Sequence, residues 1–112
     1  MDSCLNLDVL NELVDIMGED MSMLINSYIE DTESKLEQLK NMKLETQQED
    51  IFRMTHSLKG SSRNVGIVEF SDYCEVMENK ARLGELTKSD FVMDTVISLF
   101  NNAKKELIAR YT

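Results

Sequence analysis

Residues 51–63 read IFRMTHSLKGSSR and have the apolar spacing of an amphipathic helix. The positions expected to face inward recur three or four residues apart: Ile51, Thr55, Leu58 and Ser62. The positions between them share the opposite face: Arg53, His56, Lys59, Gly60 and Arg63. Because residues three, four and seven apart lie on one side of a helix, we expect this second face to meet solvent.

Helical patterns continue on both sides of this segment. The 112 residues include no proline and only four glycines, so few residues interrupt a helix. Apolar periodicity predicts helices over residues 8–17, 20–42, 46–65, 68–83 and 87–110. Thr46 and Glu49 have the spacing of a capping box, and Thr87 or Ser89 is expected to start the last helix. The pattern predicts an all-α fold, an antiparallel four-helix bundle with a short additional N-terminal helix, in a single domain over residues 1–112.

Charge and composition exclude several classes of function. The net charge of −9 argues against binding to nucleic acid or to an anionic membrane surface. No apolar run is long enough to span a bilayer, and residues 1–4 show no start of a signal peptide. Cys4 and Cys74 are far apart and form no motif, so we expect reduced thiols in a cytoplasmic protein.

His56 is the only histidine, and it lies in a basic segment of an acidic protein. No Asp or Glu occurs between Ile51 and Val68. A neutral, exposed imidazole is a nucleophile near pH 7, and Lys59, one turn further on, can neutralise an anionic group attached to it. Gly60 leaves bare backbone beside the ring, which lets another molecule approach closely. This pattern favours transfer of a phosphoryl group to and from His56.

The segment His56-Ser57-Leu58-Lys59-Gly60-Ser61-Ser62 resembles the signature of the histidine phosphotransfer (HPt) family of bacterial phosphorelays. The resemblance continues through a downstream set that matches the family's pattern: Gly66, Phe70, Cys74, Met77, Glu78, Arg82 and Gly84. It covers essentially the whole chain. Thr55 stands where the family often has alanine, and Arg63-Asn64 replaces a blander pair, which bears on the choice of partner.

The resemblance implies a role for each central residue. His56 would accept a phosphoryl group from an aspartate of one receiver domain and pass it to an aspartate of another. Lys59 would stabilise the phosphoryl group, and Gly60 would leave room for the receiver's active site. Since the receiver would bring the aspartate and the magnesium ion, we expect no metal site and no cofactor in this chain.

We expect the partners to be response-regulator receiver domains and a hybrid sensor kinase, bound by a monomer. Arg53, Arg63 and Asn64 are the candidate partner-binding residues around the histidine. The chain has no glycine-rich phosphate loop and no kinase signature. It is therefore expected to be a phosphocarrier and not an enzyme that uses ATP.

Two other functions compete with this one. A helical bundle could dock a partner without any chemistry, although the intact set of His56, Lys59 and Gly60 argues against it. A di-metal bundle enzyme needs Glu-x-x-His pairs on facing helices, which one histidine cannot supply. Elsewhere, we expect Cys74 to be a core residue, and Glu78 and Arg82 to form a simple pair on the helix surface.

Overall fold

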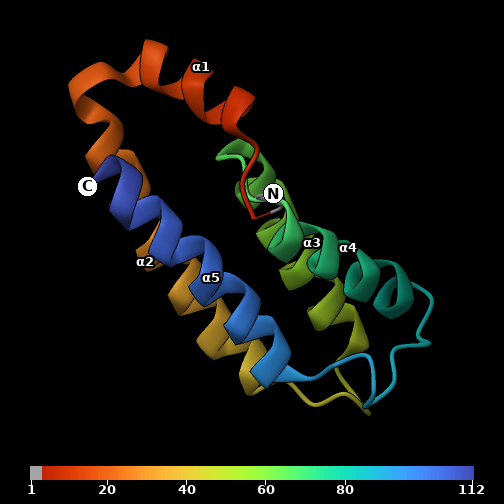
Figure 1. Ribbon diagram of the computed structural model, residues 1–112. Coiled ribbons are helices and arrows are strands. Elements are labelled where there is room, and N and C mark those ends of the chain that lie inside the picture. The colour runs from red at the N-terminus through yellow and green to blue at the C-terminus, as the bar shows by residue number, and fades with distance from the viewer. Residues whose placement is uncertain (1–3) are drawn as a thin grey trace.

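The structure, a computed structural model, describes residues 4–112. Residues 1–3, on which the expectation of no signal peptide partly rests, lie outside the described residues. The elements are α1 (Leu7–Met17), the 3-10 turn η1 (Gly18–Asp20), α2 (Met21–Lys40), α3 (Gln48–Asn64), α4 (Glu69–Arg82) and α5 (Met93–Tyr111). Helices α2 to α5 form an antiparallel four-helix bundle and α1 crosses one end of it, which confirms the predicted fold (Figure 1).

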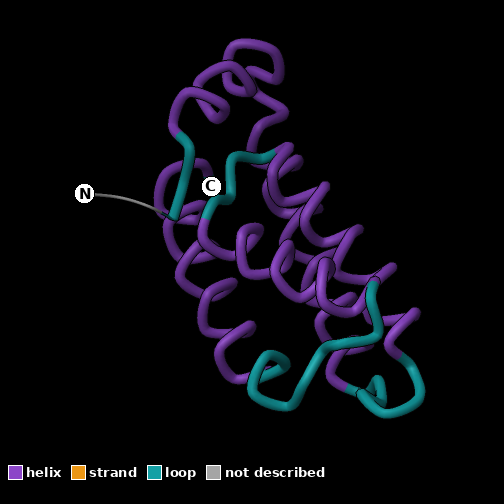
Figure 2. Tube along the Cα trace, turned by 90° about the vertical axis from the view of Figure 1, so that its right-hand side faces the viewer, coloured by secondary structure: helices purple, strands orange, loops and turns teal. Residues whose placement is uncertain are grey.

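The bundle is elongated, with extents of 44 × 27 × 21 Å. Helix α3 packs against α2 and, most extensively, against α4, while α5 packs against α2 and α4. The loops over residues 41–47 and 83–92 lie together at the end opposite α1 (Figure 2). Among residues 4–112, no helix has the length and apolar character needed to cross a membrane.

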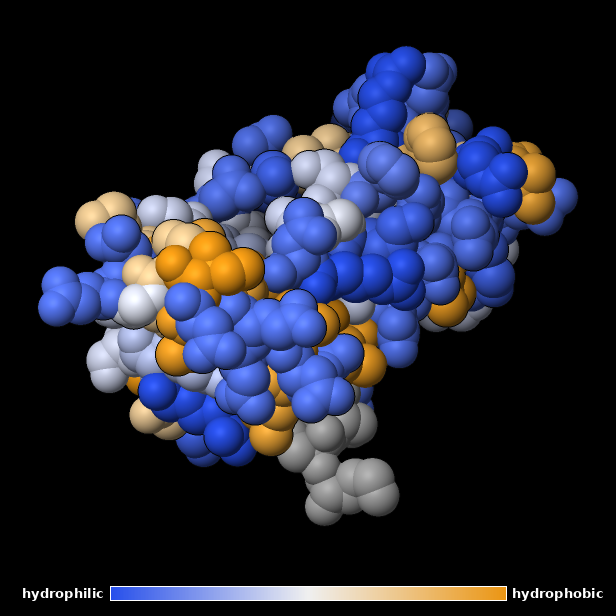
Figure 3. Space-filling model, turned by 90° about the horizontal axis from the view of Figure 1, so that it is seen from above, coloured by the Kyte–Doolittle hydropathy of each residue, from blue (hydrophilic) through white to orange (hydrophobic). Residues whose placement is uncertain are grey.

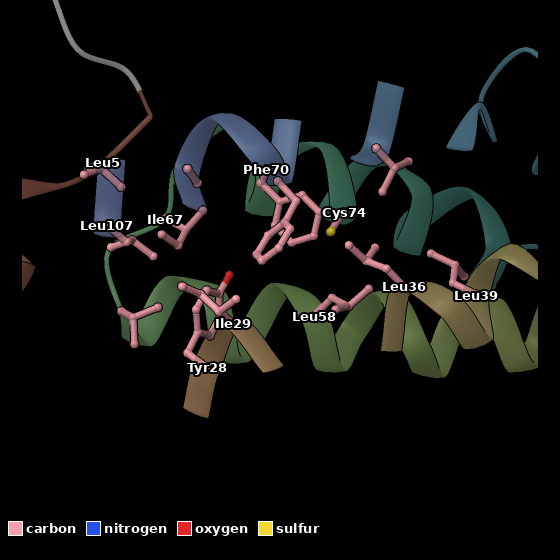
Figure 4. Close-up of a cluster of buried hydrophobic side chains, with 14 of the residues drawn as sticks. Leu5, Tyr28, Ile29, Leu36, Leu39, Leu58, Ile67, Phe70, Cys74 and Leu107 are labelled. Carbon is pink, nitrogen blue, oxygen red and sulfur yellow. The ribbon is translucent and has the colours of Figure 1, made fainter. Parts of the chain in front are cut away.

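The core fills the space between the four bundle helices. Side chains such as Leu36, Leu58, Phe70 and Leu107 come from four different helices and converge there (Figure 4). The face of α3 that was predicted to point inward is buried at each of its four positions: Ile51, Thr55, Leu58 and Ser62. The predicted core position of Cys74 is also confirmed, and burial raises the pKa of its thiol to about 12.

The segment before α1 is fastened to the turn between α3 and α4. The Asn6 amide donates to the Gly66 carbonyl at 2.6 Å, and the Val68 amide donates to the Cys4 carbonyl at 2.8 Å. The Asn6 side chain also caps α1 by accepting hydrogen bonds from its first turn. Apolar patches interrupt the polar surface at this end (Figure 3), where Ile16 is the most exposed large apolar side chain.

Two predicted helix starts differ from the structure by two residues or more, those of α3 and α5. The second helix was expected to begin near Asp20, and it begins at Met21, after the η1 turn. The predicted capping box of Thr46 and Glu49 is wrong, because α3 begins at Gln48 with no side-chain cap. Residues 87–90 form a turn of their own, because the Asp90 carboxylate accepts hydrogen bonds from the Thr87 amide and hydroxyl, so α5 begins only at Met93.

Candidate functional site

His56 lies in the middle of α3, and 64% of its side chain is exposed. The buried face of α3 points toward the core, so the imidazole lies at the surface, on the side of α3 next to α4. The Phe52 ring lies one turn earlier, with its centroid 6.2 Å from that of the imidazole. Gly60 lies one turn later and is also exposed, and a Cβ built on it would meet nothing within 4 Å. The ring therefore has an open surface of bare backbone on one side.

Glu78 of α4 holds the other edge of the imidazole. Its side chain is only 8% exposed, and its Oε2 lies 2.7 Å from His56 Nδ1. Its Oε1 lies 2.6 Å from the Nζ of Lys59. One buried carboxylate thus joins the histidine and the lysine, and it ties α3 to α4 at the middle of the bundle.

These contacts fix which ring nitrogen is available. Burial raises the pKa of the Glu78 carboxyl, but hydrogen bonds from Lys59 and His56 outweigh burial and lower the pKa overall. The carboxylate is therefore ionised near neutral pH and can only accept hydrogen bonds. His56 Nδ1 must then donate, so in the neutral ring Nε2 carries the lone pair. The structure presents an exposed nucleophilic nitrogen in one defined tautomer.

Lys59 is more buried than its place on the outer face suggested. Its side chain is 19% exposed, and its Nζ also approaches Glu75 Oε1 at 4.0 Å. The flexible four-carbon stem of a lysine lets the ammonium turn toward a new anion without moving the helix. Lys59 is therefore placed to share its charge between Glu78 and a group attached to His56.

The other predicted cations are already paired with carboxylates of the same chain. Arg53 forms an ion pair with Glu49, one turn earlier on α3. Arg63 reaches Glu75 at 3.1 Å and Asp72 at 3.2 Å, both on α4.

The contact between Arg63 and Glu75 changes the titration of both residues, since their hydrogen bond raises the pKa of Arg63 and lowers that of Glu75. The expectation of a basic surface was therefore incomplete, because acidic residues of α4 and α3 neutralise it.

Helix α2 contributes a charged group on the opposite side of α3. Lys35 donates to the hydroxyl of Ser57 at 2.9 Å and pairs with Asp31 at 2.9 Å. Ser57 directly follows His56, so α2 contributes a cation next to the histidine, while α4 contributes the carboxylate of Glu78. Among residues 4–112, no group of three or more His, Cys, Asp or Glu side chains is placed to hold a metal ion.

The model of the Hpt domain family matches residues 23–108, which include most of the bundle and all of the site. The chain belongs to the Hpt domain family. A crystal structure of histidine-containing phosphotransfer protein B (HptB) from Pseudomonas aeruginosa PAO1 is similar, with a TM-score of 0.89 and 25% sequence identity over 100% of both chains. A comparison with curated proteins found no match.

In this Hpt domain, the structure brings His56 and Lys59 together, with Gly60 at the open side of the ring. Arg53 and Arg63 lie on the same outer surface, and Asn64 is the exposed last residue of α3. The roles of these six residues stay predictions, as does the single domain over residues 1–112.

Sequence reasoning included Glu78 in the downstream set of the family resemblance but missed its place at the site. Glu78 was expected to form a surface pair with Arg82, and this is wrong, because the side chain is buried and contacts His56 and Lys59 instead. A signal was present in the sequence: Glu78 follows Cys74 by four residues and so extends the apolar stripe of α4. A carboxylate on a buried stripe needs a partner, and the partners lie on α3.

Proposed function

We propose that this Hpt domain carries a phosphoryl group on Nε2 of His56, which it accepts from an aspartyl phosphate of one receiver domain and passes to an aspartate of another. The observation that supports this best is the hydrogen bond from Nδ1 of the exposed imidazole to the buried Glu78 carboxylate. It leaves Nε2 as the only free nucleophilic atom of the ring, on the open side of α3.

The transfer needs little from this chain besides position and charge. The Nε2 lone pair attacks the phosphorus, and the bond from phosphorus to the donor carboxylate breaks. Lys59 lies one turn from His56, where its ammonium compensates the phosphoryl charge. The bare backbone at Gly60 lets the partner's active site reach the ring.

The remaining parts of the proposal concern partners and cofactors. We propose that the receiver domain supplies a magnesium ion and the aspartate, that a hybrid sensor kinase stands upstream, and that the chain works as a monomer without cofactor or ATP-dependent activity. Arg53, Arg63 and Asn64 are proposed to contact the receiver around His56. A cytoplasmic location stays a prediction.

The test offers radiolabelled receiver domains to the wild-type chain and to His56→Gln. Transfer of an acid-labile, alkali-stable label to the wild type alone, with both proteins equally helical by circular dichroism, is the expected result. Label on His56→Gln would refute the assignment, because the chain has no second histidine. Receivers that bind both proteins equally but never transfer label would identify a docking module instead.

A further inference from the structure

We propose that Glu78 keeps the proton on Nδ1 of His56 after the ring has been phosphorylated, and thereby holds the phosphoryl group in a form that can leave. This inference rests on the proposed function, because it concerns the phosphorylated state of the same histidine. It assigns Glu78 as a positioning residue that acts through the imidazole and does not touch the phosphoryl group.

The Nδ1 proton decides which leaving group the imidazole becomes when the phosphoryl group departs. If Nδ1 of a phosphorylated ring carries a proton, then breaking the N–P bond releases a neutral imidazole. If Nδ1 has lost its proton, the same step must release an imidazolide anion, which is a far stronger base and a much poorer leaving group. The rate of discharge therefore depends on whether the Nδ1 proton stays in place.

The structure places an acceptor for that proton where it is needed. Glu78 Oε2 is 2.7 Å from Nδ1, and the carboxylate is almost buried, so water competes poorly for the hydrogen bond. The phosphorylated ring with its Nδ1 proton is a cation, which a carboxylate at this distance stabilises. Lys59 binds the second oxygen at 2.6 Å, and this makes Glu78 less basic and keeps it from taking the proton itself.

Other charges near the ring come from both flanking helices. On α4, Glu75 lies 4.0 Å from the Lys59 ammonium and shares it with Glu78. On α2, Lys35 donates to Ser57, next to His56, and Asp31 balances its charge. Of these residues, only Glu78 has a carboxylate oxygen hydrogen-bonded to the imidazole. The proton on Nδ1 is therefore controlled chiefly from α4.

No proton has to move in either direction of transfer. During loading, the Nε2–P bond forms while the O–P bond of the donor breaks and its electron pair returns to the donor carboxylate. During discharge, an acceptor carboxylate oxygen attacks the phosphorus and the N–P electron pair returns to Nε2. The Nδ1–H bond and the ionised Glu78 carboxylate are the same before and after each step.

The experiment loads His56 with phosphoramidate, a small donor that needs no receiver, in the wild type, in Glu78→Gln and in Asp72→Asn. Asp72→Asn is the matched control, because it removes one exposed carboxylate from the same helix at a residue paired with Arg63. Ring nitrogen NMR follows the midpoint pH at which Nδ1 of the phosphorylated ring loses its proton. A second assay follows the rate of N–P hydrolysis over the same pH range.

We expect the midpoint to fall by about one to two pH units in Glu78→Gln, since an adjacent opposite charge has been removed. Above both midpoints, hydrolysis should then be about ten to a hundred times slower in Glu78→Gln than in the wild type. Asp72→Asn should follow the wild type. A merely structural role for Glu78 would alter the melting temperature without moving the midpoint.

Equal midpoints in the wild type and Glu78→Gln would overturn the inference. If Glu78→Gln does not fold, the wild type alone decides: an Nδ1 that has lost its proton at pH 7 in the phosphorylated protein refutes the proposal. Failure of receivers to transfer label, with these results intact, would count against the proposed function only. Failure of phosphoramidate to label Nε2 would contradict the exposed nitrogen on which both proposals depend.

Discussion

Replacing Gly60 separates the stability of the fold from its activity. Gly60 lies inside α3 with helical neighbours on both sides, and an added Cβ would meet nothing within 4 Å. A glycine at an exposed position inside a helix costs about 1 kcal/mol relative to alanine. Since no clash offsets this gain, Gly60→Ala should raise the free energy of unfolding by about 1 kcal/mol. For a chain of this size, the melting temperature should rise by about 4 °C.

The receiver domain is proposed to approach His56 through the open space beside Gly60. In Gly60→Leu the side chain would project into it beside His56, so the rate of transfer from a labelled receiver should fall at least about tenfold, as expected when close approach is lost. Loading by phosphoramidate should be unchanged, because a small donor needs no such approach. Asn102→Leu, on an exposed position of α5, is the control for an added surface leucine.

Urea denaturation and single-turnover transfer assays measure the two effects independently. A loss of stability in Gly60→Ala would show that the Cβ does meet an obstacle and that the open surface described above is wrong. Wild-type transfer by Gly60→Leu, with Asn102→Leu also unaffected, would refute the approach of the partner over Gly60.

Three further outcomes follow from other contacts. Gly66→Ala should lower the free energy of unfolding by at least about 2 kcal/mol in urea denaturation, because φ is +74° and the Cβ would lie 2.9 Å from the backbone oxygen of Asn6. The Lys80 ammonium and the hydrogen bonds from Thr87 lower the pKa of Asp90 to about 2. The ionised Asp90 therefore stabilises the fold above about pH 4, and this contribution is lost as the pH falls toward 2. In thermal melts, Asp90→Asn should have a lower melting temperature than the wild type at pH 7, and the difference should close near pH 2. Tyr28→Phe should lower the free energy of unfolding by about 1 to 2 kcal/mol, because it removes the 2.6 Å hydrogen bond to the buried Ser62 hydroxyl. If the unpaired Ser62 hydroxyl causes this loss, adding Ser62→Ala in a double-mutant cycle should recover part of it.

The sequence was sufficient for the features that repeat along a helix. The buried face of α3 and the number of long helices followed from apolar spacing, because that spacing reflects which side of a helix meets the core. The start of α5 could not be predicted in this way. Thr87 and Ser89 are good helix-capping residues, but the carboxylate of Asp90 accepts hydrogen bonds from Thr87 and forms a separate turn with it. Helix α5 therefore begins later, at Met93. Local hydrogen bonds of this kind compete with helix formation, and spacing alone does not decide between them.

The same distinction applies to the site residues: those on one helix could be predicted from their spacing, and the one on another helix could not. His56, Lys59 and Gly60 lie within two turns of one helix, so their spacing was enough to place them together. Glu78 comes from another helix, and its contact with the ring depends on how α4 is rotated and shifted against α3, which no pattern along either helix specifies. The buried Glu78 carboxylate changes the chemistry of both His56 and Lys59, since it fixes the tautomer of the histidine and also binds the lysine. A site built only from the signature would have an imidazole free to expose either nitrogen. The residue that removes this freedom lies twenty-two positions further along the chain.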